Sequence, residues 1–374
     1  MKILYIANIR FPTEKAHGLQ IMKTAENIYK SGVNLTLVTT SRGKKYNPFK
    51  FYDVEVTFPI KRIPVPDFNS RHPYIRTLID WIAFAYRARK FIKKKDFDLL
   101  LIRIHPLLLK FFTRWKKSLV LDLDDKLYSS KYLFLNDLKK IKGVIVVSNG
   151  LKKDLTSLGI KDDKILTAPN GVELENFKVN KNQKKLREGL NLPQNKEIIM
   201  YTGSFLLYGW KGVKTLLKSS HYLNRNKVIC LVGGRKKEIE KIKNKYKLNN
   251  IILIKRQPHK KIPLYLKAAD MLVLPNKKGS KVSKKYTSPM KLFEYMASKK
   301  PIIASDIPAI TEILNKSNSL LIKPNDPKKM AEAIQYISEN SNFRKNISSK
   351  AFQDVKNYTW RNRGKKILNF IKQN

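Results

Sequence analysis

The stretch IIMYTGSFLLYGWKGVKTLLKSSHYLNRNKVICLV, residues 198–232, contains the unit that decides the fold of this chain. Its apolar run Ile198–Thr202 predicts a buried strand, Val213–Leu223 a helix, and Val228–Val232 a second strand. Apolar runs without alternation are typical of parallel strands that helices cover on both faces. A strand, a helix and a parallel strand in this order form a right-handed crossover.

The same alternation continues through all 374 residues, with one interruption at Ala168–Gly171. Because more strands are predicted than one sheet holds comfortably, we expect an α/β protein of two Rossmann-like, doubly wound domains. The domains are placed at residues 1–168 and 169–355, with a last helix in residues 356–374. The predicted strands are Lys2–Ala7, Asn34–Thr39, Leu99–Arg103, Leu119–Asp122, Val144–Val147, Ile198–Thr202, Val228–Val232, Ile251–Ile254, Met271–Leu274 and Pro301–Ala304. The predicted helices include Leu19–Lys30, Ile75–Lys95, Val213–Leu223, Lys236–Lys245 and Met290–Ser298.

The composition is that of a folded and strongly basic protein. Hydrophobic residues make up 42% of the chain, and the formal net charge is +48. A single cysteine excludes an internal disulfide framework. No apolar stretch approaches the roughly 20 residues of a membrane-spanning helix, and the N-terminus is typical of a strand, not of a signal peptide. We therefore expect a cytoplasmic protein.

The positive charge has several interpretations. It can reflect a lysine-rich source, attraction to an anionic membrane at about 1 kcal/mol per nearby cation, or nucleic-acid binding. The lysines are spread over nearly every segment, and they outnumber the arginines that base recognition favours. We therefore expect no nucleic-acid partner and leave open a peripheral position on the inner face of the cell membrane.

The segment Tyr286–Ala297 predicts a helix that begins at an anion site. Ser288 is the predicted N-cap and Pro289 the first helical residue. Lys291 falls in the first turn, where a cation opposes the helix dipole unless free N–H groups hold an anion there. Glu294, one turn later, can accept two hydrogen bonds from a ribose diol. An ordinary capped helix with a surface lysine is the alternative.

A second candidate follows the predicted strand Ile198–Thr202. Gly203 and Gly212 let the backbone approach a ligand, and Lys211 places a cation at a helix start. Ligands of parallel sheets bind beyond the carboxyl ends of the strands, so we expect Lys211 and Lys291 to face one diphosphate. The pair would stabilise the negative charge of a departing nucleotide. A turn with a solvated lysine is the alternative.

These stretches in combination resemble glycosyltransferase family 4, whose members are retaining enzymes of the GT-B type. The resemblance extends over nearly the whole chain, and each stretch alone is weakly specific. The stretches that carry it are Gly18–Gln20, Ala168–Glu173 with Phe177, Lys211–Gly212, and Ser288–Ala297 with Lys300–Ser305.

The resemblance implies a hexosyltransferase that uses a UDP-sugar or GDP-sugar and a lipid-linked or cell-surface glycan acceptor, as in polysaccharide biosynthesis. It implies two domains facing across a cleft, with the donor on the second domain and the last helix returning to the first. Glu294 would contact the ribose, and Lys211 and Lys291 the diphosphate. The mechanism that the resemblance implies needs no metal, since the lysines and helix N-termini supply the counter-charge of the diphosphate, and no cofactor is expected. In that mechanism the departing phosphate deprotonates the acceptor. The donor contacts are assigned to Gly18, Gly203, Ser204, Gly212, Gln257, Thr287, Ser288, Met290 and Glu294.

Some positions depart from the family's pattern. Tyr286 stands eight residues before Glu294, where family members carry a first glutamate, and Tyr286 or Ser288 is the candidate replacement. Ser204 replaces a common arginine. Asp124 and Asp125 stand where the family has a His-Asp pair, and they are assigned to the catalytic set. A sugar or acceptor contact, a structural role and Mg²⁺ or Mn²⁺ binding stay open for them, the last least favoured.

Other functions remain open as alternatives. A nucleotide-sugar 2-epimerase on the same fold would need acid and base groups in the cleft, and a basic nucleic-acid-binding protein would bind in a strongly salt-dependent way.

The weaker site candidates are His17, His105, Gly233–Gly234 and Gln257–Pro258. The basic aromatic segments Ile75–Lys95 and Lys110–Lys117 are candidates for contact with a membrane.

Overall fold

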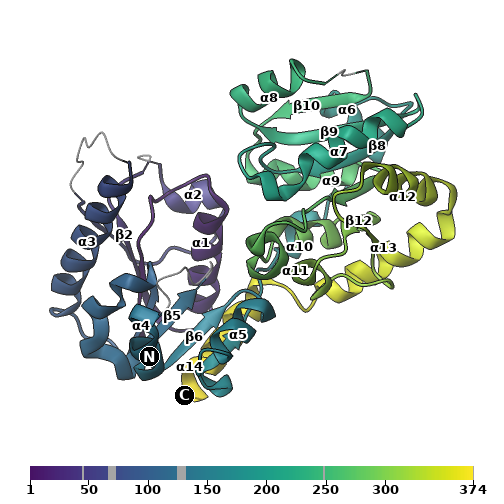
Figure 1. Ribbon diagram of the computed structural model, residues 1–374. Coiled ribbons are helices and arrows are strands. Elements are labelled where there is room, and N and C mark those ends of the chain that lie inside the picture. The colour runs from purple at the N-terminus through teal and green to yellow at the C-terminus, as the bar shows by residue number, and fades with distance from the viewer. Residues whose placement is uncertain (44–45, 66–72, 124–131, 247–248, 374) are drawn as a thin grey trace. The chain divides into compact units, whose positions relative to one another are not determined.

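The computed structural model describes residues 1–373 except 44–45, 66–72, 124–131 and 247–248. The chain divides into two compact units (Figure 1). Unit 1 comprises Met1–Pro169 and Trp360–Asn374, and unit 2 comprises Asn170–Thr359. The sequence analysis places the two boundaries earlier, after residues 168 and 355. The segment before Trp360 stays with unit 2 because Val172 bridges to Thr359 and its N–H donates to the carbonyl oxygen of Tyr358 at 3.0 Å.

In unit 1 the described residues form a seven-stranded parallel sheet in the order β3-β2-β1-β4-β5-β6-β7. Its central strands are buried on both faces, since helices cover the sheet. The strands are β1 (Lys2–Ala7), β2 (Asn34–Thr40), β3 (Ile60–Ile63), β4 (Leu99–Arg103), β5 (Leu119–Leu123), β6 (Gly143–Val146) and β7 (Ile165–Thr167). The helices are α1 (Ala16–Tyr29), α2 (Pro48–Tyr52), α3 (Pro73–Ile92), η1 (Pro106–Ser118), α4 (Tyr132–Lys140), α5 (Asn149–Thr156), η2 (Asp162–Lys164) and α14 (Trp360–Gln373).

The C-terminal helix α14 belongs to unit 1 through a buried charged network. Gly364 of α14 lies so close to α1 that an added Cβ would stand 2.9 Å from the Cβ of Asn27. Arg363 donates to the carbonyl oxygen of Ala168 and lies 3.6 Å from the Asp122 carboxylate. That carboxylate also accepts from Arg103 at 2.9 Å. Burial alone would raise the pKa of Asp122, but the charges of Arg103 and Arg363 hold that pKa below its ordinary value.

In unit 2 the described residues form a six-stranded parallel sheet in the order β10-β9-β8-β11-β12-β13. The strands are β8 (Glu197–Thr202), β9 (Lys227–Gly234), β10 (Ile251–Lys255), β11 (Met271–Leu274), β12 (Ile302–Ser305) and β13 (Leu320–Ile322). The helices are η3 (Leu174–Phe177), α6 (Gln183–Gly189), η4 (Gly209–Lys211), α7 (Val213–Ser219), η5 (Ser220–Tyr222), α8 (Lys236–Lys243), η6 (His259–Lys261), α9 (Ile262–Ala268), η7 (Val282–Tyr286), α10 (Met290–Ala297), α11 (Pro308–Thr311), α12 (Pro327–Glu339) and α13 (Ser341–Val355).

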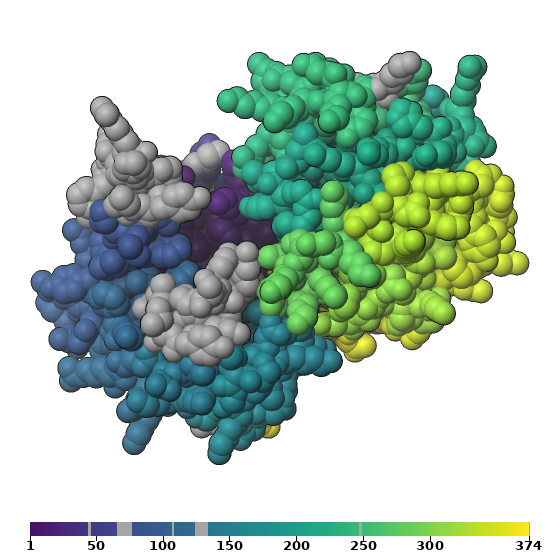
Figure 2. Space-filling model, in the orientation of Figure 1, coloured from purple at the N-terminus to yellow at the C-terminus, as the bar shows by residue number. Residues whose placement is uncertain are grey.

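Side chains of the unit 2 sheet alternate between two buried clusters. Ile198 and Met200 belong to one cluster, and Ile199 and Tyr201 to the other, as the two-residue period of a strand requires. Helices α12 and α13 cover part of the sheet, and their outer sides form the yellow-green surface of unit 2 in Figure 2. Asp326 begins α12 by accepting hydrogen bonds from the N–H groups of Lys328 and Lys329.

The α/β class and the parallel strand–helix alternation are confirmed. The sequence analysis missed β3, β7 and β13, which are edge strands of three or four residues. Helix α1 begins at Ala16 instead of Leu19, so Gly18 lies inside the helix and not in a loop before it. Among the described residues, no helix has the length and apolar character needed to cross a membrane.

Candidate functional site

The candidate site of unit 2 is built by loops that follow β8, β9, β10 and β11. Gly203 follows β8, Gly234 ends β9, and His259 follows β10. Because these strands are parallel and adjacent, their carboxyl ends lie at one edge of the sheet, which is the edge where ligands of such sheets bind. The N-terminal end of α10, with Lys291 in its first turn, joins this edge through contacts to Tyr201 and Gly203.

Gly203 makes room for Lys291. The Nζ of Lys291 lies 3.7 Å from the centroid of the Tyr201 ring. An added Cβ at Gly203 would stand 2.9 Å from that Nζ, and the φ of Gly203 is +121°, a conformation that favours glycine. The glycine after β8 therefore allows the ammonium group of α10 to pack beside the end of the strand.

Lys211 reaches the same loop from the other side. Its Nζ donates to the Ser204 Oγ at 2.9 Å and lies 4.8 Å from the centroid of the Tyr208 ring. Lys211 ends η4, and Gly212 follows it with a φ of +71°. An added Cβ at Gly212 would stand 1.6 Å from the carbonyl oxygen of Pro275. The close approach at Gly212 is thus to the segment after β11, and it fixes the turn that carries Lys211.

The two lysines form a cationic pair that makes no salt bridge with a carboxylate of the described residues. Burial lowers the pKa of Lys211 from its ordinary 10.5 to about 8, and the charge of Glu238 partly opposes the shift. Burial lowers the pKa of Lys291 well below its ordinary value, and the charge of Lys211 lowers it further, while the charge of Glu294 partly opposes the shift. Neither lysine makes a salt bridge within the described part of the chain. An anion beside both would compensate this charge. The arrangement is therefore typical of an anion site.

Glu238 holds the loop after β8 in place, and the sequence analysis did not identify it. One carboxylate oxygen accepts from the N–H groups of Leu206 and Leu207 at 2.6 and 2.8 Å. The other accepts from the N–H of Arg235 at 3.0 Å. Burial raises the pKa of Glu238, but the hydrogen bonds from these N–H groups hold that pKa below its ordinary value. A glutamate at the third position of α8 was the signal available in the sequence.

Gly233 and Gly234 let the loops after β8 and β9 pack closely. An added Cβ at Gly233, whose φ is +120°, would stand 2.7 Å from the carbonyl oxygen of Gly203. An added Cβ at Gly234 would overlap the Phe205 ring at 2.2 Å. Both glycines therefore serve the packing of the site loops.

Glu294 is held by a histidine that the sequence analysis did not single out. The Glu294 side chain is 12% exposed, and its Oε1 lies 2.7 Å from the Nε2 of His259. His259 begins η6, two residues after Gln257, whose Nε2 donates to the carbonyl oxygen of Lys255 at 3.2 Å. The spacing between His259 and Glu294 gives no hint of this contact, because the two residues come from different loops.

Helix α10 begins at the first residue of the predicted range Met290–Ser298, but its N-cap differs by one residue from the prediction. The helix begins at Met290, Pro289 occupies the N-cap position, and no side chain caps the first turn. The N-cap prediction for Ser288 is wrong, because the φ and ψ of Pro289 are −67° and 122°, outside the helical region. The Ser288 hydroxyl instead accepts from the N–H of Asn170 at 3.0 Å, and the Ser288 carbonyl accepts from the Asn170 amide. Thr287 stands between η7 and this segment.

The candidates of unit 1 are placed as follows. Gly18 lies in the first turn of α1, where an added Cβ would stand 2.2 Å from the Tyr52 hydroxyl. His105 follows β4 and stacks on Trp81 with ring centroids 4.7 Å apart. Asp124 and Asp125 lie outside the described residues. Within the described residues, no group of three or more His, Cys, Asp or Glu side chains has an arrangement that could hold a metal ion.

Family models match both halves of the chain. The model "Glycosyltransferase Family 4" matches residues 19–176, and the model "Glycosyl transferases group 1" matches residues 182–354. An uncharacterized glycosyltransferase of Methanocaldococcus jannaschii is 26% identical over 75% of this chain and 68% of its own length. The N,N'-diacetylbacillosaminyl-diphospho-undecaprenol alpha-1,3-N-acetylgalactosaminyltransferase of Campylobacter jejuni is 26% identical over 65% of this chain and 62% of its own length.

Solved structures share the fold. The Anabaena protein HepE in complex with UDP has a TM-score of 0.79 and 16% identity, with both chains covered to 100%. HepE in complex with UDP-glucose has a TM-score of 0.78. At this level of identity the likeness concerns the fold alone. With family models matching both halves and two Rossmann-like sheets in place, this chain belongs to the family 4 type of glycosyltransferases, with the GT-B fold.

Proposed function

We propose that this glycosyltransferase transfers a hexose from a UDP-sugar or GDP-sugar, with retention of anomeric configuration, to a lipid-linked or cell-surface glycan acceptor. The observation that carries the donor proposal is the cationic pair of Lys211 and Lys291, which makes no salt bridge within the described residues and lies beside the start of α10, where no side chain caps the helix. A diphosphate satisfies the cations and the free N–H groups of that helix start together.

The proposed mechanism relies on alignment and charge stabilisation. The bond between the anomeric carbon and the donor phosphate breaks, and the acceptor oxygen bonds to the same face of the sugar. The departing phosphate takes the acceptor proton. Lys211 and Lys291 stabilise the charge that grows on the diphosphate, and pre-positioned charges of this kind supply a large share of catalysis. No metal or cofactor is part of this mechanism.

Donor binding is assigned to unit 2. The carboxylate of Glu294 accepts hydrogen bonds from the ribose hydroxyls, and His259 holds that carboxylate in position. Gly203, Ser204 and Gly212 shape the diphosphate loop, and the segment with Gln257 flanks the base. Solved relatives with UDP and UDP-glucose support a nucleotide-sugar donor. The remaining assignments are Thr287, Ser288 and Met290 to the donor, and Gly18, Asp124 and Asp125 in unit 1 to the donor sugar or acceptor side.

The acceptor proposal rests on the relatives and on surface chemistry. The name of the Campylobacter relative specifies a diphospho-undecaprenol acceptor. Helix α3 exposes the apolar side chains Leu78, Ile82 and Tyr86, at 49%, 42% and 62% exposure, in a chain of net charge +48. An exposed apolar row in a basic protein suits the surface of an anionic membrane, so peripheral attachment to the inner face of the cell membrane is part of the proposal.

A thermal-shift screen tests the donor proposal. UDP-, GDP-, ADP- and CMP-sugars are added to the full chain, and the true donor should raise the melting temperature by linkage. NMR analysis of the product then determines whether the anomeric configuration is retained. Turnover of the donor to an epimer without any acceptor would contradict transfer and favour a 2-epimerase.

A further inference from the structure

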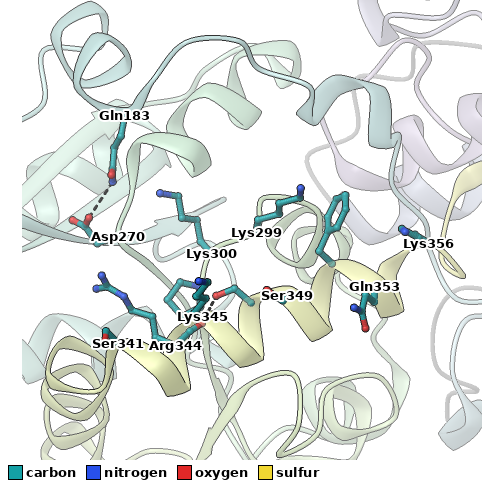
Figure 3. A pocket seen from close by; sticks show the side chains of 13 residues that line it. Gln183, Asp270, Lys299, Lys300, Ser341, Arg344, Lys345, Ser349, Gln353 and Lys356 are labelled. Atoms are coloured by element: carbon teal, nitrogen blue, oxygen red, sulfur yellow. Dashed lines mark hydrogen bonds between the residues drawn. The ribbon is translucent and has the colours of Figure 1, made fainter.

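A pocket of about 640 Å³ lies at the edge of the unit 2 sheet opposite the lysine pair (Figure 3). Its wall includes Asp270 and Pro301, which precede β11 and β12, and the exposed side of α13. Because the strands are parallel, these residues mark the amino ends of the strands, whereas Gly203 follows a carboxyl end. At about 3.3 Å per residue, even the short strand β11 separates the two edges by roughly 13 Å. The pocket is therefore not part of the donor site.

Cations dominate the pocket wall. Figure 3 shows Lys299 and Lys300 extending over α13, which presents Arg344 and Lys345 along the same side. Three serine hydroxyls of α13 stand among these cations. The hydroxyl-bearing residues are Ser341, Ser348 and Ser349.

The carboxylates at this edge already have partners within the protein. Asp270 accepts from the guanidinium of Arg187 at 2.6 Å and from the N–H of Ile198 at 2.7 Å. Arg344 lies 3.7 Å from Glu197, whose carboxylate lies 3.4 Å from Lys227. Within the described residues, Lys300 and Lys345 make no salt bridge. The pocket therefore carries positive charge that the protein itself does not neutralise.

Lys300 is held in this position at an energetic cost, and Lys299 stands next to it. Burial lowers the pKa of Lys300 to about 8, and although Asp270 opposes the shift, nearby cations including Lys267 add to it. Lys299 follows Ser298, the C-cap of α10, and adopts the φ of +59° that is common at the end of a helix. Its Nζ lies 4.2 Å from the centroid of the Phe352 ring. Lys300 is thus a partly buried cation of the pocket wall, and Lys299 is an exposed cation beside it.

We propose that the pocket is a second anion site, which binds a phosphoryl-bearing ligand through Lys300, Lys345 and the hydroxyl of Ser349. Lysine ammonium groups act as compact point charges and hydroxyls as short-range donors, a combination that suits the tetrahedral oxygens of a phosphate. The volume admits a small phosphate ester, a diphosphate or the headgroup of a phosphorylated lipid. The inference does not depend on the proposed donor.

Equilibrium dialysis of inorganic pyrophosphate against the full chain tests the proposal. The ionic strength is kept at about 150 mM, so that long-range attraction is screened. The double variant Lys300→Gln, Lys345→Gln should bind at the pocket about tenfold more weakly or worse. The matched control is Lys214→Gln, Lys218→Gln, which removes the same charge from exposed positions of α7 and should change binding by less than about twofold. Equal loss in both double variants, or no loss in the pocket variant, overturns the proposal.

Further arms separate the pocket from the lysine pair and identify the source of the phosphate. Pocket binding should persist in the variant Lys211→Met, Lys291→Met, because the pair lies at the other edge of the sheet. Sedimentation with phosphatidate vesicles, compared with phosphatidylcholine vesicles, tests a lipid source. Lys345 is exposed, so the variant Lys345→Gln should fold normally. If this variant loses binding to the vesicles, the ligand is a lipid headgroup. If the Lys345→Gln variant binds pyrophosphate more weakly but binds vesicles as before, the ligand is a soluble phosphate compound. Absence of both effects overturns the site.

Discussion

Replacing Lys211 with methionine should raise the stability of the protein while lowering its turnover. The pKa of Lys211 falls from 10.5 to about 8 through burial. At about 1.36 kcal/mol per unit of pKa, keeping this lysine charged costs the folded state on the order of 3 kcal/mol at neutral pH. Methionine keeps the length of the side chain beside Tyr208 and carries no charge, so most of that cost disappears.

The pH dependence of this effect has a defined sign. Because the pKa in the folded state lies below that of the unfolded state, the cost is fully present below about pH 8 and decreases as the pH rises toward about 10.5. The gain from Lys211→Met should therefore be about 1–3 kcal/mol at pH 7, allowing for the lost hydrogen bond to Ser204, and should vanish toward pH 10. Guanidinium chloride unfolding at several pH values measures it.

Turnover should change in the opposite direction. A unit charge about 4 Å from a phosphate contributes up to about 4 kcal/mol at an effective dielectric constant of 20. Loss of this charge predicts a fall in kcat of about tenfold or more, measured as release of the nucleoside diphosphate. The control Lys214→Met, at an exposed position of α7, should alter neither quantity. A Lys211→Met variant that is less stable at pH 7 and fully active would refute the reasoning.

The other predictions concern a glycine, the ribose contact and the buried charges of unit 1. Gly212→Ala should destabilise unit 2 and reduce donor affinity, measured by thermal shift, because the new methyl group meets the carbonyl oxygen of Pro275; a variant with unchanged melting temperature and affinity contradicts this. His259→Ala should raise the KM for the donor by about three- to thirtyfold with a smaller change in kcat, since the carboxylate of Glu294 loses its partner at 2.7 Å; steady-state kinetics that show only a kcat effect would exclude this role. Asp122→Asn should lower the free energy of unfolding by about 3–5 kcal/mol, because two buried guanidinium groups lose their counter-charge; a loss under about 1 kcal/mol in denaturant titrations would count against the network.

The sequence predicted the central strands well and the sheet edges poorly. Strands such as β1 and β8 are buried on both faces, and continuous apolar runs identify them directly. The edge strand β3 reads Ile-Lys-Arg-Ile, and β7 and β13 have three residues each. Such short pairings depend on a neighbouring strand that the local sequence does not specify, so no local pattern marks them.

The cations of the candidate site were predictable from the sequence, whereas the residues that position its loop and its glutamate were not. Lys211 and Lys291 each stand at a helix start, where a positive charge conflicts with the dipole and therefore draws notice. Glu238 and His259 act through contacts between loops far apart in the sequence. Gly203 matters because a side chain there would meet the ammonium group of Lys291, and this contact exists only in the folded chain.

The central claim is that a diphosphate binds between Lys211 and Lys291, and proton uptake on binding tests it most directly. Calorimetric titration with UDP and GDP at about pH 8, in buffers of different ionisation enthalpy, measures the protons that the complex takes up. Because Lys211 is about half protonated at that pH, bound diphosphate should draw in roughly half a proton or more, with tighter binding for the true nucleotide. This uptake should become smaller in Lys211→Met and disappear in the double variant Lys211→Met, Lys291→Met, because the pKa of Lys291 is lowered as well. Tight binding with no proton uptake, unchanged in Lys211→Met and Lys291→Met, would place the diphosphate elsewhere.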